Sequence, residues 1–301
     1  MSGEIERNMN LFLQLTANGL VNGALYAVLA VGFGLVWRSL RVFHVAYGGL
    51  FVVTAYVFHT LVAQAGLSPL AALLLTIICA AIIGWAMELG FYRLFYWKNA
   101  ASGVVLIASL GIFIALENAV ALISGNELQT VSRGLVRTWT LGPVVLTELQ
   151  VIEFLAGSAV VALLWLLTRR LRIFKALWAM GDQPALIPVL GLPFYGLRAL
   201  VMALSTALVA IPACLLTLDI GIDPHMGMSY LLIAAVAVLV GGIDRYGGWI
   251  VGAVVLALLQ SLVVWQLSAR WMDFVTFGLL VAMLVFRPEG LMARHRRMEE
   301  R

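Results

Sequence analysis

The stretch NGLVNGALYAVLAVGFGLV, residues 18–36, contains no charged side chain from its first position to its last. A helix needs about 20 apolar residues to cross a bilayer, so this stretch is long enough to do so. Comparable runs recur along the whole chain of 301 residues, of which 63% are hydrophobic and 11% are charged, and the mean hydropathy is +1.02. Soluble domains carry about 25% charged residues. The composition therefore predicts a polytopic integral membrane protein in which the whole chain, 1–301, forms one transmembrane domain.

The pattern of the apolar runs decides between the two folds that can span lipid. Only helices and closed barrels satisfy every backbone hydrogen bond there, and barrel strands alternate apolar with polar residues. These runs are continuous, so we expect an all-α bundle of eight or nine spanning helices. The seventh run is short and lies between Pro224 and the pair Gly241–Gly242, which indicates a broken or partly re-entrant helix. The nine expected segments are 11–37, 45–65, 69–91, 103–124, 150–168, 197–218, 225–241, 248–267 and 271–286.

Basic residues are distributed unevenly between the loops. If the N-terminus is outside, all but four of the 19 lysines and arginines lie on the inside. Cytoplasmic loops are enriched in these residues, so we expect the N-terminus outside and the C-terminus inside. The net charge of +4 is then a topology signal, and nucleic acid is not an expected partner because no compact basic domain exists. The four outside are Arg7, Arg133, Arg137 and Arg270.

Three local features complete the outline of the chain. The outer loop 125–149 contains the alternating stretch VRTWTLGPVVLT, with Gly142–Pro143 at its centre, which predicts a short hairpin. Cys79 and Cys214 lie in apolar runs, which favours small buried side chains over a disulfide or a metal site. Residues 1–10 contain two glutamates and one arginine, a pattern that does not indicate a signal peptide.

Polar side chains in the first segment form a line along one helical face. Asn18, Asn22 and Tyr26 are spaced at i, i+4 and i+8. Such a line can face a solute pathway or form hydrogen bonds to neighbouring helices, and the sequence leaves both interpretations open. Gly19 and Gly23 lie four positions apart, a spacing that favours close packing of two helices.

A second group of candidate pathway residues lies near the starts of later segments. His44 and Tyr47 belong to FHVAYGG, residues 43–49, and His225 precedes the short seventh segment. His44 can titrate, contact a solute or cap a helix. Tyr47 can line a pathway or anchor the chain at the membrane interface.

Ionisable residues inside apolar runs are the feature that an ion-coupled carrier requires. Glu117 is the only such residue that we place well inside a run, whereas Glu88 lies close to Arg93 and is expected to pair with it. We find no arrangement that resembles a proton relay. The remaining ionisable residues in or near the runs are His59, Asp219, Asp223 and Asp273.

Motifs for catalysis and nucleotide binding are absent from the sequence. It contains no phosphate-binding P-loop, no HExxH, no GxSxG and no CxxC. We therefore expect no enzymatic activity, no cofactor and no metal. A chain without a nucleotide site cannot power transport by itself.

The stretch TRRLRIFKALWAMGDQPALIPVLGLPFYG, residues 168–196, interrupts the apolar runs with basic residues that place it on the inside. It is too apolar for a free loop, which favours either docking to a partner protein or an amphipathic helix lying on the lipid surface. We expect Asp182 or Gln183 to cap a second short helix that begins at Pro184. Gly191, followed by Pro193, is expected to end that helix.

Six stretches in order resemble one family. They are NGLVNGALYAVLAVGFGLV, FHVAYGG, YRLFYW with LIASLGIFIALEN, KALWAMGDQPALIPVLGL, DIGIDPHMGMSYLLIAAVAVLVGGIDRYGGWIVGA, and RPEGL. Across roughly residues 11–291, the chain resembles the transmembrane permease subunits of branched-chain amino acid ABC importers, of the LivH/LivM type and closer to LivH. The resemblance implies a bacterial-type inner membrane protein that works by alternating access.

The resemblance also implies partners and a coupling segment. The expected partners are a homologous permease subunit, two cytoplasmic ATP-binding subunits and an external solute-binding protein. Residues 169–196 would insert into a cleft of an ATP-binding subunit, and Pro184 and Pro188 depart from the usual helical run there. The matching positions are Lys175, Ala176, Ala179, Asp182 and Gly191.

The substrate stays open at this point. His44 replaces an asparagine of the family, and Tyr47 replaces a histidine. Related permeases handle urea, short amides and other small polar solutes as well as branched-chain amino acids. An ion-coupled secondary carrier and a passive channel for urea or amides are the alternatives to an ATP-driven importer.

A weak internal similarity predicts an inverted repeat. FHVAYGGLFVVTAYV (43–57) and PHMGMSYLLIAAVAV (224–238) share a histidine followed by small residues at a helix start, and the first enters from inside and the second from outside. We therefore expect segments one to four to repeat as segments six to nine. Inverted repeats place the pathway at their interface, with His44 and His225 at opposite mouths.

Overall fold

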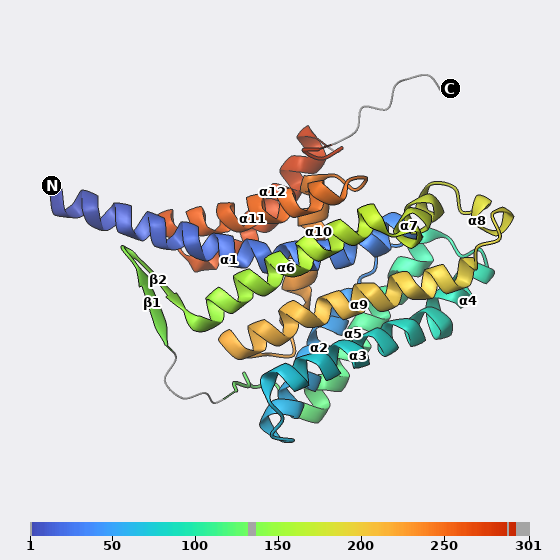
Figure 1. Ribbon diagram of the computed structural model, residues 1–301, viewed down its shortest axis with the longest axis horizontal. Helices are drawn as coiled ribbons and strands as arrows, with labels where there is room; N and C mark the ends of the chain where they lie inside the picture. Colours follow the sequence, from blue (N-terminus) through green and yellow to red (C-terminus); the bar gives the residue numbers. More distant parts are fainter. Residues whose placement is uncertain (1, 132–136, 288, 293–301) are drawn as a thin grey trace.

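The computed structural model describes residues 2–131, 137–287 and 289–292 as a bundle of long helices with one small hairpin (Figure 1). Eight helices are long and apolar enough to cross a membrane, and a ninth, α10, has 15 residues. The predicted all-α membrane fold is confirmed, including the short seventh segment. The helices of the bundle are α1 (Ser2–Leu40), α2 (Ala46–Ala63), α3 (Pro69–Met87) continued by the π-helical turn η1 (Glu88–Tyr92) and α4 (Arg93–Trp97), α5 (Ser102–Ser124), α6 (Glu148–Arg170), α9 (Phe194–Asp219), α10 (Gly227–Gly241), α11 (Tyr246–Gln266), and the short turn η2 (Ala269–Trp271) with α12 (Met272–Phe286).

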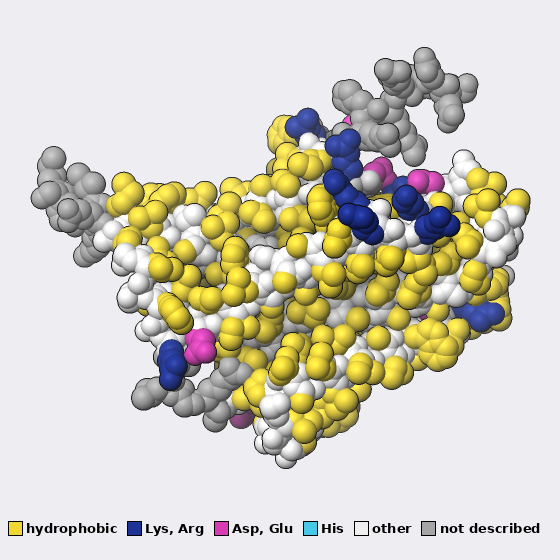
Figure 2. All heavy atoms as spheres, in the orientation of Figure 1, with side chains coloured by type: hydrophobic (Ala, Val, Ile, Leu, Met, Phe, Trp, Pro, Cys, Tyr) yellow, Lys and Arg dark blue, Asp and Glu magenta, His cyan; other side chains and the backbone are white. Residues whose placement is uncertain are grey.

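Among the long helices α1, α2 and α9 are the most buried, and the shorter α10 is buried along most of its length. In the apolar part of α1, 89% of the residues are buried, whereas in the last spanning segment, Ala269–Phe286, 6% are buried. Apolar side chains of α3, α5, α6 and α12 cover the sides of the molecule, and charged side chains gather at its two ends (Figure 2). This distribution is what a lipid-embedded bundle requires, because the hydrocarbon core solvates apolar surface and not charge.

The central helices cross in a paired pattern. α1 packs against α11 and α10, while α9 packs against α3 and α2, and α1 also contacts α9. The first turns of α2 and α10 meet at Gly48 and Gly227, where a Cβ added to either glycine would lie 2.5 Å from the carbonyl oxygen of the other. Only glycine permits this approach, so the two helix starts are fixed against each other inside the bundle.

The predicted hairpin is present at one end of the molecule. β1 (Thr138–Leu141) pairs antiparallel with β2 (Val144–Thr147) through a two-residue loop, and Gly142 has a φ of +63°. Loops of this length need a positive φ, which glycine supplies without strain. The hairpin is held to α1 because the Gln14 side chain exchanges two hydrogen bonds with the backbone of Val145, at 2.8 and 2.7 Å.

The opposite end carries the loop between α6 and α9. It contains α7 (Arg172–Asp182) and α8 (Leu186–Val189), and most of the lysine and arginine side chains visible in Figure 2 gather there. The orientation with the N-terminus outside stays a prediction. Five arginines of that prediction lie outside the described residues, namely Arg133, Arg294, Arg296, Arg297 and Arg301.

Candidate functional site

The polar line of α1 runs from the half-buried surface into the core. Asn18 accepts a hydrogen bond from Gln14 at 3.2 Å, and Tyr26 is buried. Gly19 and Gly23 lie against α11, next to Ser261 and Val254. The glycines therefore pack two helices together. Asn22 is half-buried, and the pathway role of Asn18, Asn22 and Tyr26 stays a prediction.

His44 and Tyr47 are enclosed by protein. His44 Nδ1 lies 2.6 Å from the hydroxyl of Tyr92, which lies 2.9 Å from the hydroxyl of Ser109. Ser109 in turn accepts the backbone N–H of Ala46, and the Tyr47 hydroxyl donates to the carbonyl of Leu29. This chain of hydrogen bonds ties the segment between α1 and α2 to η1 and α5. His44 is thus not at an open mouth in this structure, and its environment differs from that of the exposed His225.

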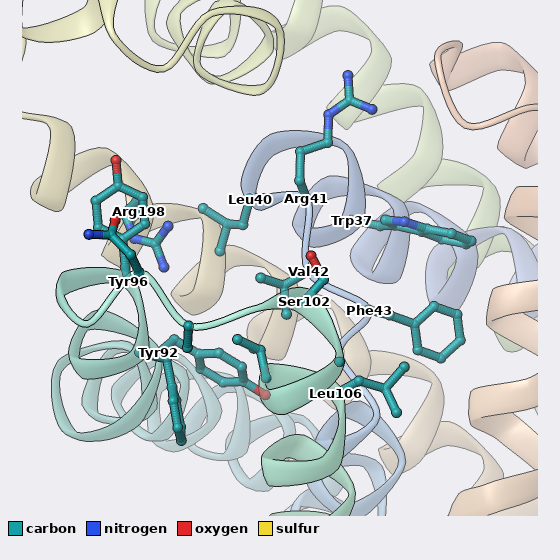
Figure 3. Close-up of a pocket in the computed structure, with 15 residues that line it drawn as sticks. Trp37, Leu40, Arg41, Val42, Phe43, Tyr92, Tyr96, Ser102, Leu106 and Arg198 are labelled. Atoms are coloured by element: carbon teal, nitrogen blue, oxygen red, sulfur yellow. The ribbon is translucent and has the colours of Figure 1, made fainter.

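A cavity of about 570 Å³ opens near the α7 end of the bundle (Figure 3). Aromatic rings surround it, and in Figure 3 the Arg41 side chain points away from it. It lies where the end of α1, the start of α5 and the start of α9 approach η1 and α4. Its lining includes Trp37, Phe43, Tyr92, Tyr96, Ser102 and Arg198.

The buried ion pair beside this cavity differs from the predicted one. Arg198 of α9 donates from Nε to Oε1 of Glu88 at 2.5 Å and from Nη2 to Oε2 at 3.3 Å, and both side chains are almost fully buried. The predicted pairing of Glu88 with Arg93 is wrong. Arg93 instead stacks its guanidinium on the rings of Trp97 and Tyr195. Arg198, near the start of α9, therefore neutralises Glu88, although Arg93 follows Glu88 by only five residues in the sequence.

The loop segment at the α7 end presents one buried and one exposed face. Phe174, Leu177 and Met180 of α7 are buried against the bundle at helical spacing. In α8, Ile187 is buried, whereas apolar side chains on both sides of it in the sequence are exposed. Lys175 and Ala179 are exposed, Ala176 is half-buried, and Val189 and Leu190 are 80% and 67% exposed.

The end of α8 confirms the predicted helix stop. Gly191 has a φ of +72°, its N–H donates to the carbonyl of Pro188, and the N–H of Leu192 donates to that of Ile187. This is a Schellman motif. The predicted start of the same helix is wrong. α8 begins at Leu186, its preceding residue makes no side-chain cap, and Pro184 lies in the turn before it.

Asp182 does not cap α8 because Arg38 holds its carboxylate. Arg38 Nη2 donates to Asp182 Oδ1 at 2.6 Å, and its Nε lies 3.1 Å from Oδ1 of Asp244 in the loop between α10 and α11. The guanidinium also lies over the ring of Trp178, and Arg41 donates to the carbonyl of Gly181. Arg38 therefore joins α1, the end of α7 and the α10–α11 loop. Asp182, the last residue of α7, therefore contacts Arg38 of α1.

A further ion pair lies near the hairpin end. His225 Nδ1 is 2.5 Å from Oε1 of Glu117 in α5, and the His225 side chain is 57% exposed. Asp223 Oδ1 accepts the backbone N–H of His225 at 2.6 Å. His225 lies in the segment 220–226 that joins α9 to α10, outside the spanning helices. The hydrogen bond to Glu117 raises the pKa of His225 above its usual value.

Several groups escaped the sequence analysis. Glu153 of α6 is 2% exposed, so Glu117 is not the only carboxylate well inside a run. The sequence could have identified Glu153, because it is the only charged residue within the apolar segment 150–168.

The two cysteines, Cys79 and Cys214, are free thiols. Among the described residues, no group of three histidine, cysteine or acidic side chains could hold a metal ion.

Taken together, the described residues form a polytopic helical bundle with polar groups in its interior and a structured loop at one end. Residues 15–284 match the model of the family described as branched-chain amino acid transport system / permease component. The chain belongs to this family.

Related proteins cover nearly the whole chain. It is 28% identical over 297 residues to the high-affinity branched-chain amino acid transport system permease protein BraD of Pseudomonas aeruginosa, covering 94% of this chain and 96% of BraD. It is 25% identical over 297 residues to LivH of Escherichia coli, with the same coverage of each chain. A solved structure, PsaBC from Streptococcus pneumoniae in complex with Fab, covers 96% of this chain and 97% of that chain with a TM-score of 0.49 and 15% identity.

Proposed function

We propose that this multi-pass chain is the permease subunit of an ATP-driven importer in a bacterial-type inner membrane, and that it carries branched-chain amino acids or related small polar solutes. Membership of the permease family and the names of the relatives support the class and the solute. A chain without a nucleotide site needs an ATP-binding partner to drive transport. The observation that supports coupling to such a partner is the exposed apolar end of α8, which offers a surface for binding it. ATP hydrolysis therefore takes place on separate subunits.

The coupling surface lies on the cytoplasmic end of the molecule. We define it as Lys175, Ala176, Ala179 and Gly191 together with the exposed Val189 and Leu190. An exposed apolar group flanked by polar residues is typical of a protein interface. The same end gathers the basic side chains, which supports the orientation with the N-terminus outside.

Arg38 connects this surface to the transport helices. Its contacts to Asp182 and Asp244 join the end of α7 to α1 and to the α10–α11 loop. A partner that moves α7 and α8 therefore moves α1 and α10 with them. In the alternating-access mechanism that we propose, this linkage opens the bundle alternately to its two ends.

The helix packing supports an inverted repeat as the frame for this motion. Exchanging α1 with α9, α2 with α10 and α3 with α11 converts each observed contact among these six helices into an observed contact of the same set. The reciprocal approach of Gly48 and Gly227 lies on the axis of such an exchange. Two related halves that cross at this point can rock against each other.

The partners follow from the proposed class. A second, homologous permease subunit covers exposed membrane faces of this one, two ATP-binding subunits bind on the cytoplasmic side, and a solute-binding protein delivers the solute outside. An ion-coupled carrier is the second candidate, favoured only by the carboxylates Glu117 and Glu153 at membrane depth.

A single charge on α8 tests the coupling surface. The Val189→Asp variant should abolish co-purification of the ATP-binding subunits while the permease still inserts, because Val189 is 80% exposed and makes little contact with the bundle. The matched control is Leu128→Asp, which changes a residue that is 62% exposed in the outer loop. Retention of the ATP-binding subunits by Val189→Asp at the wild-type level would refute docking at this surface.

A further inference from the structure

The Glu117–His225 pair lies on a partly exposed face, set back from the end of α5. Glu117 precedes the end of α5 at Ser124 by seven positions, which is about 10 Å at the rise of an α-helix. His225 reaches this depth because the segment 220–226 descends to the start of α10, where Gly227 contacts Gly48. Charged groups at such depth face a cavity, a pathway or a protein partner, and not lipid.

The pair is incomplete as a structural ion pair. One oxygen of Glu117 contacts one nitrogen of His225, and among the described residues neither the second oxygen nor the second nitrogen makes a hydrogen bond. The exposed fraction of the side chain is 57% for His225 and 17% for Glu117. Each group thus keeps a free polar atom on a partly open face. Asp223 fixes the backbone of His225 and leaves its ring free.

The two free atoms match the head group of an amino acid. A carboxylate oxygen accepts hydrogen bonds from an ammonium group, and an imidazolium N–H donates to a carboxylate. We infer that Glu117 and His225 form a zwitterion site on the transport pathway, with Glu117 binding the α-ammonium group and His225 the α-carboxylate of the solute. This inference rests on the proposed function and specifies the solute class within it.

The surroundings suit an amino acid with an apolar side chain. Ile114, one helical turn before Glu117, is 50% exposed, and Met228, three residues after His225, is 37% exposed. A neutral solute such as urea or an amide has neither an ammonium group for the free oxygen of Glu117 nor a carboxylate for the free nitrogen of His225. The raised pKa of His225 further favours the imidazolium that a carboxylate needs.

The test measures binding of radiolabelled leucine to the assembled importer in nanodiscs, with ATP-binding subunits present and without the solute-binding protein. We expect Glu117→Gln and His225→Gln each to weaken leucine binding at least tenfold. 4-Methylpentanoate, which lacks the ammonium group, and leucinamide, which lacks the carboxylate, should compete poorly in the wild type. Glu127→Gln in the outer loop is the control and should bind leucine like the wild type.

A second variant separates recognition from folding. Glu117→Asp keeps the charge and should retain leucine binding to within a few-fold. If Glu117 had only a structural role, the Asp and Gln variants would lose leucine binding equally. Wild-type affinity in Glu117→Gln, equal losses in the Asp and Gln variants, or no leucine binding by the wild-type complex would each overturn the inference. ATP-driven leucine uptake by the wild type, in any of these cases, would leave the proposed function standing.

Discussion

Buried charge is the feature of single residues that bears most on stability. Glu88 and Arg198 are 1% and 4% exposed, and two hydrogen bonds join them across helices that are 110 residues apart in sequence. Removing one charge from such a pair leaves the other without a partner in a poorly solvated place.

Glu88→Gln should therefore lower the free energy of unfolding by about 3 to 5 kcal/mol, because Arg198 stays buried with its charge uncompensated. The measurement is denaturant unfolding of the purified protein in detergent. The double variant Glu88→Gln with Arg198→Met should recover a large part of the loss, since it removes both charges. A double variant less stable than the single one would show that the pair is not the cause.

The charge on His225 makes leucine binding depend on pH. The pKa of His225 is raised by its hydrogen bond to Glu117, with Asp223 as a further acidic neighbour. The imidazolium is therefore complete below the usual pKa of about 6.5 and is lost as the pH rises through the raised value. Leucine binding should fall over that upper range. His225→Gln should bind weakly with no such fall, and a wild-type profile that is flat there would contradict the role of the ring.

Residue pairs of this kind are beyond single-sequence analysis. Glu117 and His225 each stood out, as a charge in an apolar run and a histidine at a helix start. Their contact spans 108 positions, and no local pattern encodes it. The same holds for Arg38 and Asp182, which are 144 positions apart and whose contact removes the expected helix cap.

At the scale of elements, the apolar runs predicted the helices well. A spanning helix has either lipid or other helices on every side, so nearly all of its residues must be apolar. The hairpin and the stop of α8 were also predictable, since Gly142 and Gly191 supply the positive φ that those turns need. The start of α8 was not, because its cap was taken by a distant arginine. Local rules hold where no tertiary contact competes with them.

The contacts of Arg38 predict how α7 acts on the bundle. Arg38→Gln should keep the ATP-binding subunits attached and should lower leucine uptake at least tenfold, because the charged links to Asp182 and Asp244 are lost. ATP hydrolysis should continue without stimulation by the loaded solute-binding protein. Arg41→Gln is the matched control, because Arg41 is more exposed, donates one hydrogen bond to the carbonyl of Gly181, and lies 3.9 Å from Asp182 Oδ1 where Arg38 lies at 2.6 Å. Normal uptake in Arg38→Gln would contradict this linkage.

At the scale of the whole molecule, charge and symmetry organise the chain. The uneven distribution of lysine and arginine predicted two distinct ends, and the structure places α7 and α8 at the end where basic side chains gather. The similarity between 43–57 and 224–238 hinted at two related halves, and the crossed packing of α1, α2, α9 and α10 supports them. The faces that a second permease subunit covers could not be predicted, because lipid and protein contacts both require apolar residues.

Energy-dependent uptake of radiolabelled leucine by the complete complex in proteoliposomes tests the central claim most directly. The account predicts accumulation against a gradient that requires ATP on the side of α7 and α8 and survives an uncoupler that collapses the proton gradient. Uptake that persists without ATP and stops with the uncoupler would contradict it, because the driving force would then come from an ion and not from a motor bound to α8.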